Sequence, residues 1–124
     1  MKTCVEVKES ARLGPVDVVR GRAPKRPLFE LGQIMVTESL LAHLDQETID
    51  FTLVEHQSGR WGDVHDVELL HNARALAQGG YLFSAYFTRG GIRFWVVTDG
   101  DRSRTVLMLP EDQEYDSVSV QAAL

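Results

Sequence analysis

The chain has 124 residues, of which 44% are hydrophobic and 25% charged, with thirteen basic and eighteen acidic side chains. These values are typical of one globular domain and exclude a largely disordered or membrane-embedded chain. The net charge of −5 argues against a dedicated nucleic-acid-binding protein, because such proteins usually carry a basic excess.

Cysteine content and apolar segments restrict the class further. Cys4 is the only cysteine, which excludes an intrachain disulfide and a thiolate-only zinc site within one chain. The N-terminus lacks the continuous apolar segment of a signal peptide, and no window approaches the roughly eighteen apolar residues of a membrane span. We therefore expect a cytoplasmic protein without a membrane partner.

Charge divides the chain near residue 28. Residues 1–28 have a net charge of +4 and residues 29–124 a net charge of −9. The prolines and glycine within 20–27 predict a linker, and Val16–Val19 is a candidate edge strand. The expected organisation is a basic leader and linker over 1–28, a single domain over 29–112 and a tail over 113–124. Contact with nucleic acid is disfavoured for the body and stays open for the basic leader.

The first half of the body indicates one strand and two or three helices. Rough apolar alternation predicts a strand over 29–36, and Thr37 is a suitable N-cap for a short helix ending near Asp45. Residues 48–56 fit a second helix, although their content would also suit a strand. A helix after Asp66 is predicted to share one apolar face and to stop at Gly79–Gly80; the face consists of Val67, Leu70, Ala73, Leu76 and Ala77.

From residue 81 the apolar period changes to two. The segments 81–88, 92–98 and 105–109 are separated by glycine-containing turns and predict a three-strand antiparallel meander. Its inner face is expected to carry Phe83, Ala85, Phe94 and Val96. A strand, two or three helices and three strands in this order give an α+β fold with the helices on one face of an antiparallel sheet.

His56, Asp63, Asn72 and Ser84 are a candidate catalytic group. A histidine with an aspartate that orients it can act as a general base, and a serine on a neighbouring strand can act as a nucleophile. However, Ser84 lies in the middle of a predicted strand and has no nucleophile-elbow motif, which favours an ordinary packing role. With Arg102 added, the catalytic candidates are His56, Asp63 and Arg102.

Metal and cofactor motifs are absent from the sequence. His56, His65 and His71 do not have the spacing of a helical pair of zinc ligands, so we expect no metal site. The sequence contains neither a P-loop nor a dinucleotide-binding glycine motif. We therefore expect no cofactor.

The candidate binding residues are Trp61, Asp63, Asn72, Asp101 and Arg102. Trp61 lies in a turn between two glycines, where it would serve either as a plug over the helices or as an exposed interface anchor. Asp101 and Arg102 have a structural alternative, because an aspartate in a turn accepts backbone N–H groups and an arginine pairs with a carboxylate.

Five ordered motifs cover about two thirds of the chain. They are Phe29-x-Leu31-Gly32-Gln33-Ile34, His56-x-x-Gly59-x-Trp61-Gly62-Asp63, Asn72-x-x-Ala75-Leu76, Ser84-x-Tyr86, and Trp95-Val96-Val97-Thr98-x-x-Asp101-Arg102-x-x-Thr105-x-x-Leu109-Pro110-Glu111. This set resembles a family of small bacterial plasmid-related proteins carried on mobile elements, some of which are labelled type I restriction subunits. The resemblance implies a mobile-DNA context in the bacterial cytoplasm and no particular reaction.

Two functions follow from these patterns. The first is an acidic accessory protein of a mobile element that acts by protein–protein interaction and inhibits a host or defence factor, since negative charge can compete for a nucleic-acid groove. The alternative is a small toxin-like RNase or other hydrolase that uses His56 and Arg102. Whether the chain is an enzyme stays open between the two, as does its oligomeric state.

Overall fold

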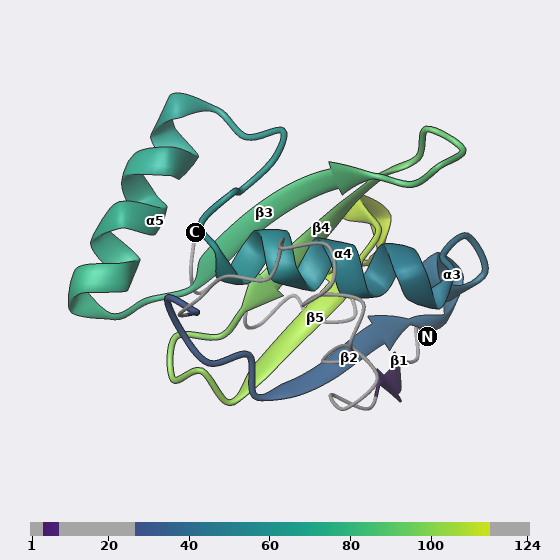
Figure 1. Ribbon diagram of the computed structural model, residues 1–124, viewed down its shortest axis with the longest axis horizontal. Helices are drawn as coiled ribbons and strands as arrows, with labels where there is room; N and C mark the ends of the chain where they lie inside the picture. Colours follow the sequence, from purple (N-terminus) through teal and green to yellow (C-terminus); the bar gives the residue numbers. More distant parts are fainter. Residues whose placement is uncertain (1–3, 8–26, 115–124) are drawn as a thin grey trace, which may run out of the picture.

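A five-stranded sheet with three α-helices forms the fold of the protein (Figure 1). The structure is a computed structural model and describes residues 4–7 and 27–114. None of the helices in these ranges is long and apolar enough to cross a bilayer. The elements are β1 (Cys4–Val7), β2 (Gln33–Thr37), α3 (Glu38–Leu41), α4 (Gln46–Gln57), α5 (Asp66–Gln78), β3 (Leu82–Phe87), β4 (Arg93–Thr98), β5 (Arg104–Met108) and the 3-10 helix η1 (Pro110–Glu114).

The strands lie in the order β1-β2-β5-β4-β3. β3, β4 and β5 form the predicted antiparallel meander, so the α+β class is confirmed. The predicted order differs in its first part, because two strands, β1 and β2, precede the helices instead of one. The sheet as a whole is mixed, because β2 runs parallel to β5, with Ile34 beside Thr105. This pairing joins segments about seventy residues apart, which a local apolar period does not reveal.

β2 begins later than the predicted strand over 29–36. Phe29 and Leu31 are buried but precede the strand, and Gly32 adopts φ +66 between them and Gln33. A Cβ at Gly32 would lie 2.3 Å from the backbone carbon of Ser103. The chain therefore turns at Gly32, against the β4–β5 turn, before it enters the sheet.

The sheet extends into the predicted leader through β1, which pairs antiparallel with β2. The candidate strand Val16–Val19 lies outside the described residues, and so does the predicted tail beyond Glu114. At the other end of the body, Gln113 and Glu114 belong to η1.

α4 settles the choice between helix and strand for residues 48–56. Asp45 caps the helix, since its carboxylate accepts a hydrogen bond of 2.7 Å from the N–H of Thr48. Ile49, Leu53 and His56 follow at spacings of four and three, and all three are buried. Figure 1 shows α4 crossing one face of the sheet.

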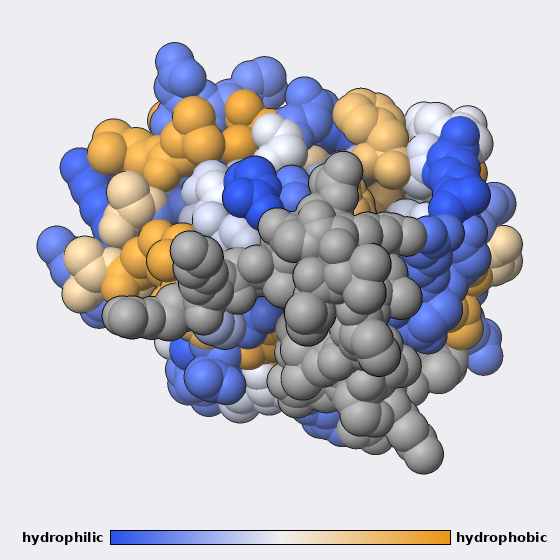
Figure 2. All heavy atoms as spheres, in the orientation of Figure 1, coloured by the Kyte–Doolittle hydropathy of each residue, from blue (hydrophilic) through white to orange (hydrophobic). Residues whose placement is uncertain are grey.

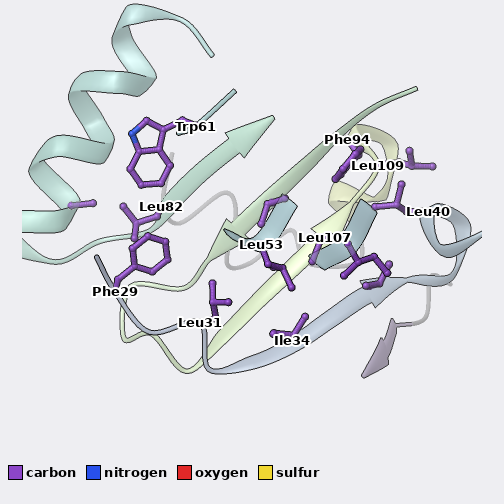
Figure 3. Close-up of a cluster of buried hydrophobic side chains, with 14 residues drawn as sticks. Phe29, Leu31, Ile34, Leu40, Leu53, Trp61, Leu82, Phe94, Leu107 and Leu109 are labelled. Carbon is purple, nitrogen blue, oxygen red and sulfur yellow. The ribbon is translucent and has the colours of Figure 1, made fainter. Parts of the chain in front are cut away.

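The main core lies between α4 and this face of the sheet (Figure 3). Phe94 and Val96 belong to it as predicted, but Phe83 packs in a second cluster with Trp95 and Val97. The predicted inner face was therefore wrong for β3. Phe83 is paired with Val97, whereas Ser84 is paired with Val96, and directly paired residues point to the same side of a sheet.

α5 has the predicted length, but its predicted apolar face does not enter the core. Asn72 and Ala75 are its only buried residues, while Val67 and Leu70 are exposed by 76% and 53%. The helix lies beside the β3 edge of the sheet rather than across its face (Figure 1). The apolar face can stay exposed because polar contacts, described below, hold α5 in place.

The loop before α5 covers the outer edge of β3. The N–H of Ala85 donates to the carbonyl of Trp61 at 3.0 Å, and the N–H of Asp63 donates to the carbonyl of Ala85 at 2.7 Å. Gly62 lies between these bonds with φ +80, and a Cβ there would lie 2.1 Å from the Ala85 oxygen. Only glycine permits this approach, so Gly62 fixes the loop to the sheet.

We expect Gly62→Ala to lower the free energy of unfolding by at least about 2 kcal/mol, because the methyl group meets backbone and φ is positive. Gly91→Ala is the matched control, since Gly91 has a similar φ of +89 and nothing within 4 Å of its would-be Cβ. Denaturant unfolding of both variants measures the difference. Equal losses of stability in the two variants would show that the Gly62 contact is unimportant.

Candidate functional site

His56 lies at the C-terminal end of α4 and binds two strands. Its Nδ1 is 2.5 Å from the Ser84 hydroxyl on β3, and its Nε2 is 2.9 Å from the Thr98 hydroxyl on β4. The Thr98 Oγ1 is in turn 2.7 Å from the Thr105 Oγ1 on β5. Both nitrogens of the ring therefore have partners.

The carbonyl of Leu31, at the end of this row of hydrogen bonds, sets the donor and acceptor of each bond. Thr105 donates its hydroxyl to the carbonyl of Leu31 at 2.7 Å, and a carbonyl can only accept. The Thr98 hydroxyl must then donate to Thr105, and the Thr98 oxygen accepts from Nε2–H of His56. With Nε2 protonated, the neutral imidazole accepts the Ser84 hydroxyl at Nδ1.

The surroundings of His56 keep the ring neutral. His56 has no exposed surface, and the rings of Phe29 and Trp61 pack edge-to-face on it with centroid distances of 5.1 and 5.5 Å. Burial, with a smaller contribution from the charge of Arg102, lowers the pKa of His56 to about 3. The imidazole is therefore neutral at every physiological pH.

Ser84 and His56 have the hydrogen bond of a nucleophile and its general base. The predicted pairing of these two residues is therefore present. Ser84 is as fully buried as His56, so neither side chain can reach a substrate in this conformation. The geometry holds the core together and leaves the serine without access to solvent.

Asp63 does not orient His56. Its carboxylate accepts from Nε of Arg93 at 3.0 Å on the surface. Thr98 occupies the place that sequence spacing suggested for the aspartate. The predicted group of His56, Asp63, Asn72 and Ser84 thus divides, and only His56 and Ser84 touch.

Asn72 completes the outer edge of β3. Its side-chain amide donates to the Phe83 carbonyl at 2.8 Å, and its oxygen accepts from the Phe83 N–H at 3.0 Å. The buried amide therefore replaces a neighbouring strand at this residue. It also anchors α5 to the sheet, which explains why the helix is held without burying its apolar face.

Arg102 binds backbone rather than a carboxylate. Its guanidinium donates to the carbonyls of Ala75, at 3.0 Å, and Gly80, at 2.6 Å, and also to two carbonyls of its own turn. These bonds cap the C-terminus of α5 and join it to the β4–β5 turn. Arg102 itself adopts φ +63.

Asp101 has a local role in the same turn. Its carboxylate accepts from the N–H and the hydroxyl of Ser103 at 3.0 and 2.6 Å. These hydrogen bonds lower the pKa of the exposed Asp101 carboxyl. The structural interpretation of Asp101 is therefore confirmed, whereas Arg102 binds carbonyl groups instead of the expected carboxylate.

Trp61 is a plug and not an exposed anchor. It is 9% exposed and stacks on Phe29 with ring centroids 6.1 Å apart. Figure 3 shows the two rings side by side next to Leu82. Trp61 closes the end of the core that contains His56.

The other described histidines near this region have separate partners. The N–H of His65 donates to the Glu68 carboxylate at 2.7 Å, and Nε2 of His71 lies 2.9 Å from the carbonyl of Tyr81. In residues 4–7 and 27–114, no three histidine, cysteine or acidic side chains are grouped to hold a metal ion.

Asp112 is a buried carboxylate that the sequence pattern did not single out. It accepts from the hydroxyl of Thr37 at 2.6 Å, the hydroxyl of Ser39 at 2.7 Å and the N–H of Leu109 at 3.0 Å. These bonds tie η1 to the junction of β2 and α3. Ser39 and Asp112 are 73 residues apart, so no local signal predicts the contact.

A shallow groove of about 320 Å³ lies between α4 and the end of β3. Two exposed phenylalanines, Phe51 and Phe87, line it together with Arg89, which is paired with Glu47 at 2.7 Å. None of the predicted site residues lies in it. The groove was missed because the two phenylalanines belong to segments that the sequence pattern assigns to the core.

Comparison of the chain with protein-family models, with curated proteins and with solved structures gives no match. The resemblance to plasmid-related proteins therefore stays a prediction.

The buried His56 predicts a loss of stability in acid. The unfolded chain binds a proton at a His pKa of about 6.5, whereas the folded His56 resists protonation down to about 3. Between these values the unfolded state holds more protons, so His56 lowers the free energy of unfolding by about 1.4 kcal/mol for each pH unit below 6.5.

We expect denaturant unfolding from pH 7 to pH 4 to show this slope in the difference between wild type and His56→Gln. Taking the difference removes the contribution of the carboxyl groups, which the two proteins share. Parallel pH curves for the two proteins would contradict a neutral buried imidazole.

Replacing Asn72 with aspartate tests the edge of β3. Asn72→Asp keeps the acceptor for the Phe83 N–H but places a second oxygen against the Phe83 carbonyl, so we expect a loss of about 2–4 kcal/mol. Gln78→Glu makes the same chemical change at an exposed site of α5 and should cost less than about 0.5 kcal/mol. Thermal unfolding compares the two, and equal midpoints would remove the role assigned to Asn72.

Proposed function

We propose that the protein is an acidic accessory protein of a bacterial mobile element that binds a basic surface of a host or defence protein in the cytoplasm. The mobile-element context and the cytoplasmic setting rest on the resemblance of its motifs. The mode of action rests on the charge of the described residues.

The main support for this proposal is that five of the six arginines in residues 27–114 are already bound within the fold. Residues 27–114 contain fourteen acidic side chains, six arginines and no lysine. Arg60, Arg89, Arg93 and Arg104 form ion pairs with carboxylates, and Arg102 binds backbone carbonyls. Residues 27–114 therefore have little positive charge left for a phosphate backbone, which nucleic-acid binding requires.

Negative charge, by contrast, is available at the surface. Glu30, Glu38, Asp66 and Glu111 are exposed and form no hydrogen bond or ion pair in the described residues. Glu38 and Glu111 are chain neighbours of residues that the Ser39–Asp112 contact joins, so they belong to the same part of the surface. Such charge attracts a basic groove over several ångströms and accelerates association with it.

The alternative, an RNase or hydrolase that uses His56 and Arg102, has less support. A catalytic base must come within hydrogen-bonding distance of the substrate, and His56 is fully buried. Both of its nitrogens and the guanidinium of Arg102 are already bound within the fold. The 2.5 Å contact with Ser84 is the one observation that favours hydrolysis.

Capture from nuclease-treated bacterial lysate tests the proposal. The immobilised full chain should retain a small set of basic proteins at low salt and release them when duplex DNA is added as a competitor. Neutralising three free carboxylates, in the variant Glu30→Gln, Glu38→Gln and Glu111→Gln, should reduce retention several-fold because the net charge falls in magnitude by three.

A variant with three substitutions at exposed, uncharged residues is the control, because it changes the surface without changing its charge. Ala42, Gln46 and Gln78 are exposed, and replacing them with serine should leave retention unchanged. Equal retention by wild type and the neutralised variant would overturn the proposal. Release of soluble fragments from mixed RNA by the wild type, and not by His56→Gln, would favour the hydrolase instead.

A further inference from the structure

The outward half of α5 is apolar and exposed. Val67, Leu70 and Leu76 are exposed by 76%, 53% and 37%, and Ala73 and Ala77 are exposed between them. We call these five residues, which were predicted to face the core, the α5 stripe. Hydrophobic side chains gather over α5 on the left of Figure 2. The buried residues Asn72 and Ala75 lie on the opposite side of the helix.

Two charged residues on the outward side of α5 have no partner in the residues that the structure describes. Arg74 is the one arginine of residues 27–114 that forms no hydrogen bond or ion pair there, and it is exposed. Asp66 is likewise exposed and unpaired, two turns earlier on the same side of the helix. Their separation of eight residues, about 12 Å along the axis, is too large for a direct pair within one helix.

We propose that Val67, Leu70 and Ala73 of the α5 stripe form the contact between two copies of this chain, with the two α5 helices packed antiparallel about a two-fold axis near Leu70. Leu76 and Ala77 lie beyond the first residue of the partner helix in this arrangement. A two-fold axis at this residue places Arg74 of each copy beside Asp66 of the other. It also places Val67 opposite the small Ala73, so that large and small side chains alternate across the contact. The helix dipoles oppose each other in this arrangement, which favours it.

The proposal is independent of the function proposed above. It follows from the self-complementarity of one helix: the same surface supplies the apolar residues, the cation and the anion, as a two-fold contact requires. Two helices of 13 residues bury less than the roughly 1,200 Å² of a stable interface. We therefore expect a reversible dimer that dissociates on dilution into the low micromolar range.

Sedimentation of the full chain at concentrations from about 1 to 200 μM should show a concentration-dependent shift from monomer to dimer. Leu70→Glu should raise the dissociation constant at least about tenfold. Phe87→Ser is the control, since Phe87 is equally exposed but lies at the far end of β3. A monomer at every concentration, or a larger effect of Phe87→Ser than of Leu70→Glu, would overturn the proposal.

Charge exchange tests the antiparallel arrangement itself. Arg74→Asp and Asp66→Arg should each remain monomeric, because each homodimer would bring like charges together. An equimolar mixture of the two variants should dimerise again, since both charge pairs are then opposite. Circular dichroism verifies that each variant keeps its helices. A mixture that stays monomeric while the wild type dimerises would exclude the antiparallel pairing about Leu70.

Discussion

The hydrogen-bonded chain through His56 is the constraint on which the core depends. A buried imidazole without partners would cost several kcal/mol, so each group in the chain must be present and correctly placed. This row of hydrogen bonds joins α4 to β3, β4 and β5 and ends at the carbonyl of Leu31, just before β2. Because a carbonyl terminates it, the proton positions are fixed in one arrangement. A shift of β4 or β5, or a rotation of α4, would break two of these bonds, and a shift of β3 would break one, so the network selects one register as well as stabilising it.

The other polar side chains in the candidate site complete backbone hydrogen bonds where regular structure ends. Asn72 supplies the missing neighbour of β3, Arg102 binds the carbonyl of Ala75 in the last turn of α5 and that of Gly80 just after it, and Asp112 ties η1 to the end of β2. Buried backbone groups need such partners, and loops around a small sheet cannot always provide them from their own backbone. Residues typical of catalysis in the sequence therefore serve the fold in this structure.

The sequence predicted the elements better than their faces and contacts. Apolar period and glycine turns identified the meander, and the helix over 66–78 was placed correctly. The face of β3 could not be chosen, because both faces are partly apolar and only pairing with β4 sets the register. Asp63 was considered as the residue that orients His56, whereas the imidazole bonds Ser84 and Thr98, which lie 28 and 42 residues away in the sequence. For α5, the pattern revealed an apolar stripe but not whether the chain itself covers it.

Polar contacts hold α5 to the sheet, and this explains why its apolar residues stay exposed. Ala75 is the only apolar residue that it buries, and the hydrogen bonds of Asn72 and Arg102 hold it to the sheet. The exposed apolar side chains of its outward half therefore contribute little to the packing of residues 27–114, and the proposed contact with a second copy would bury them. Two acidic copies repel each other and salt screens this repulsion, but salt also screens the two Arg74–Asp66 pairs of the contact, so the two effects of salt on association along α5 oppose each other. Attraction of the acidic surface to a basic partner weakens under the same conditions. The two contacts proposed for this protein therefore differ in their dependence on ionic strength, because the contact with a basic partner is electrostatic throughout, whereas the α5 contact also has an apolar part that salt does not screen.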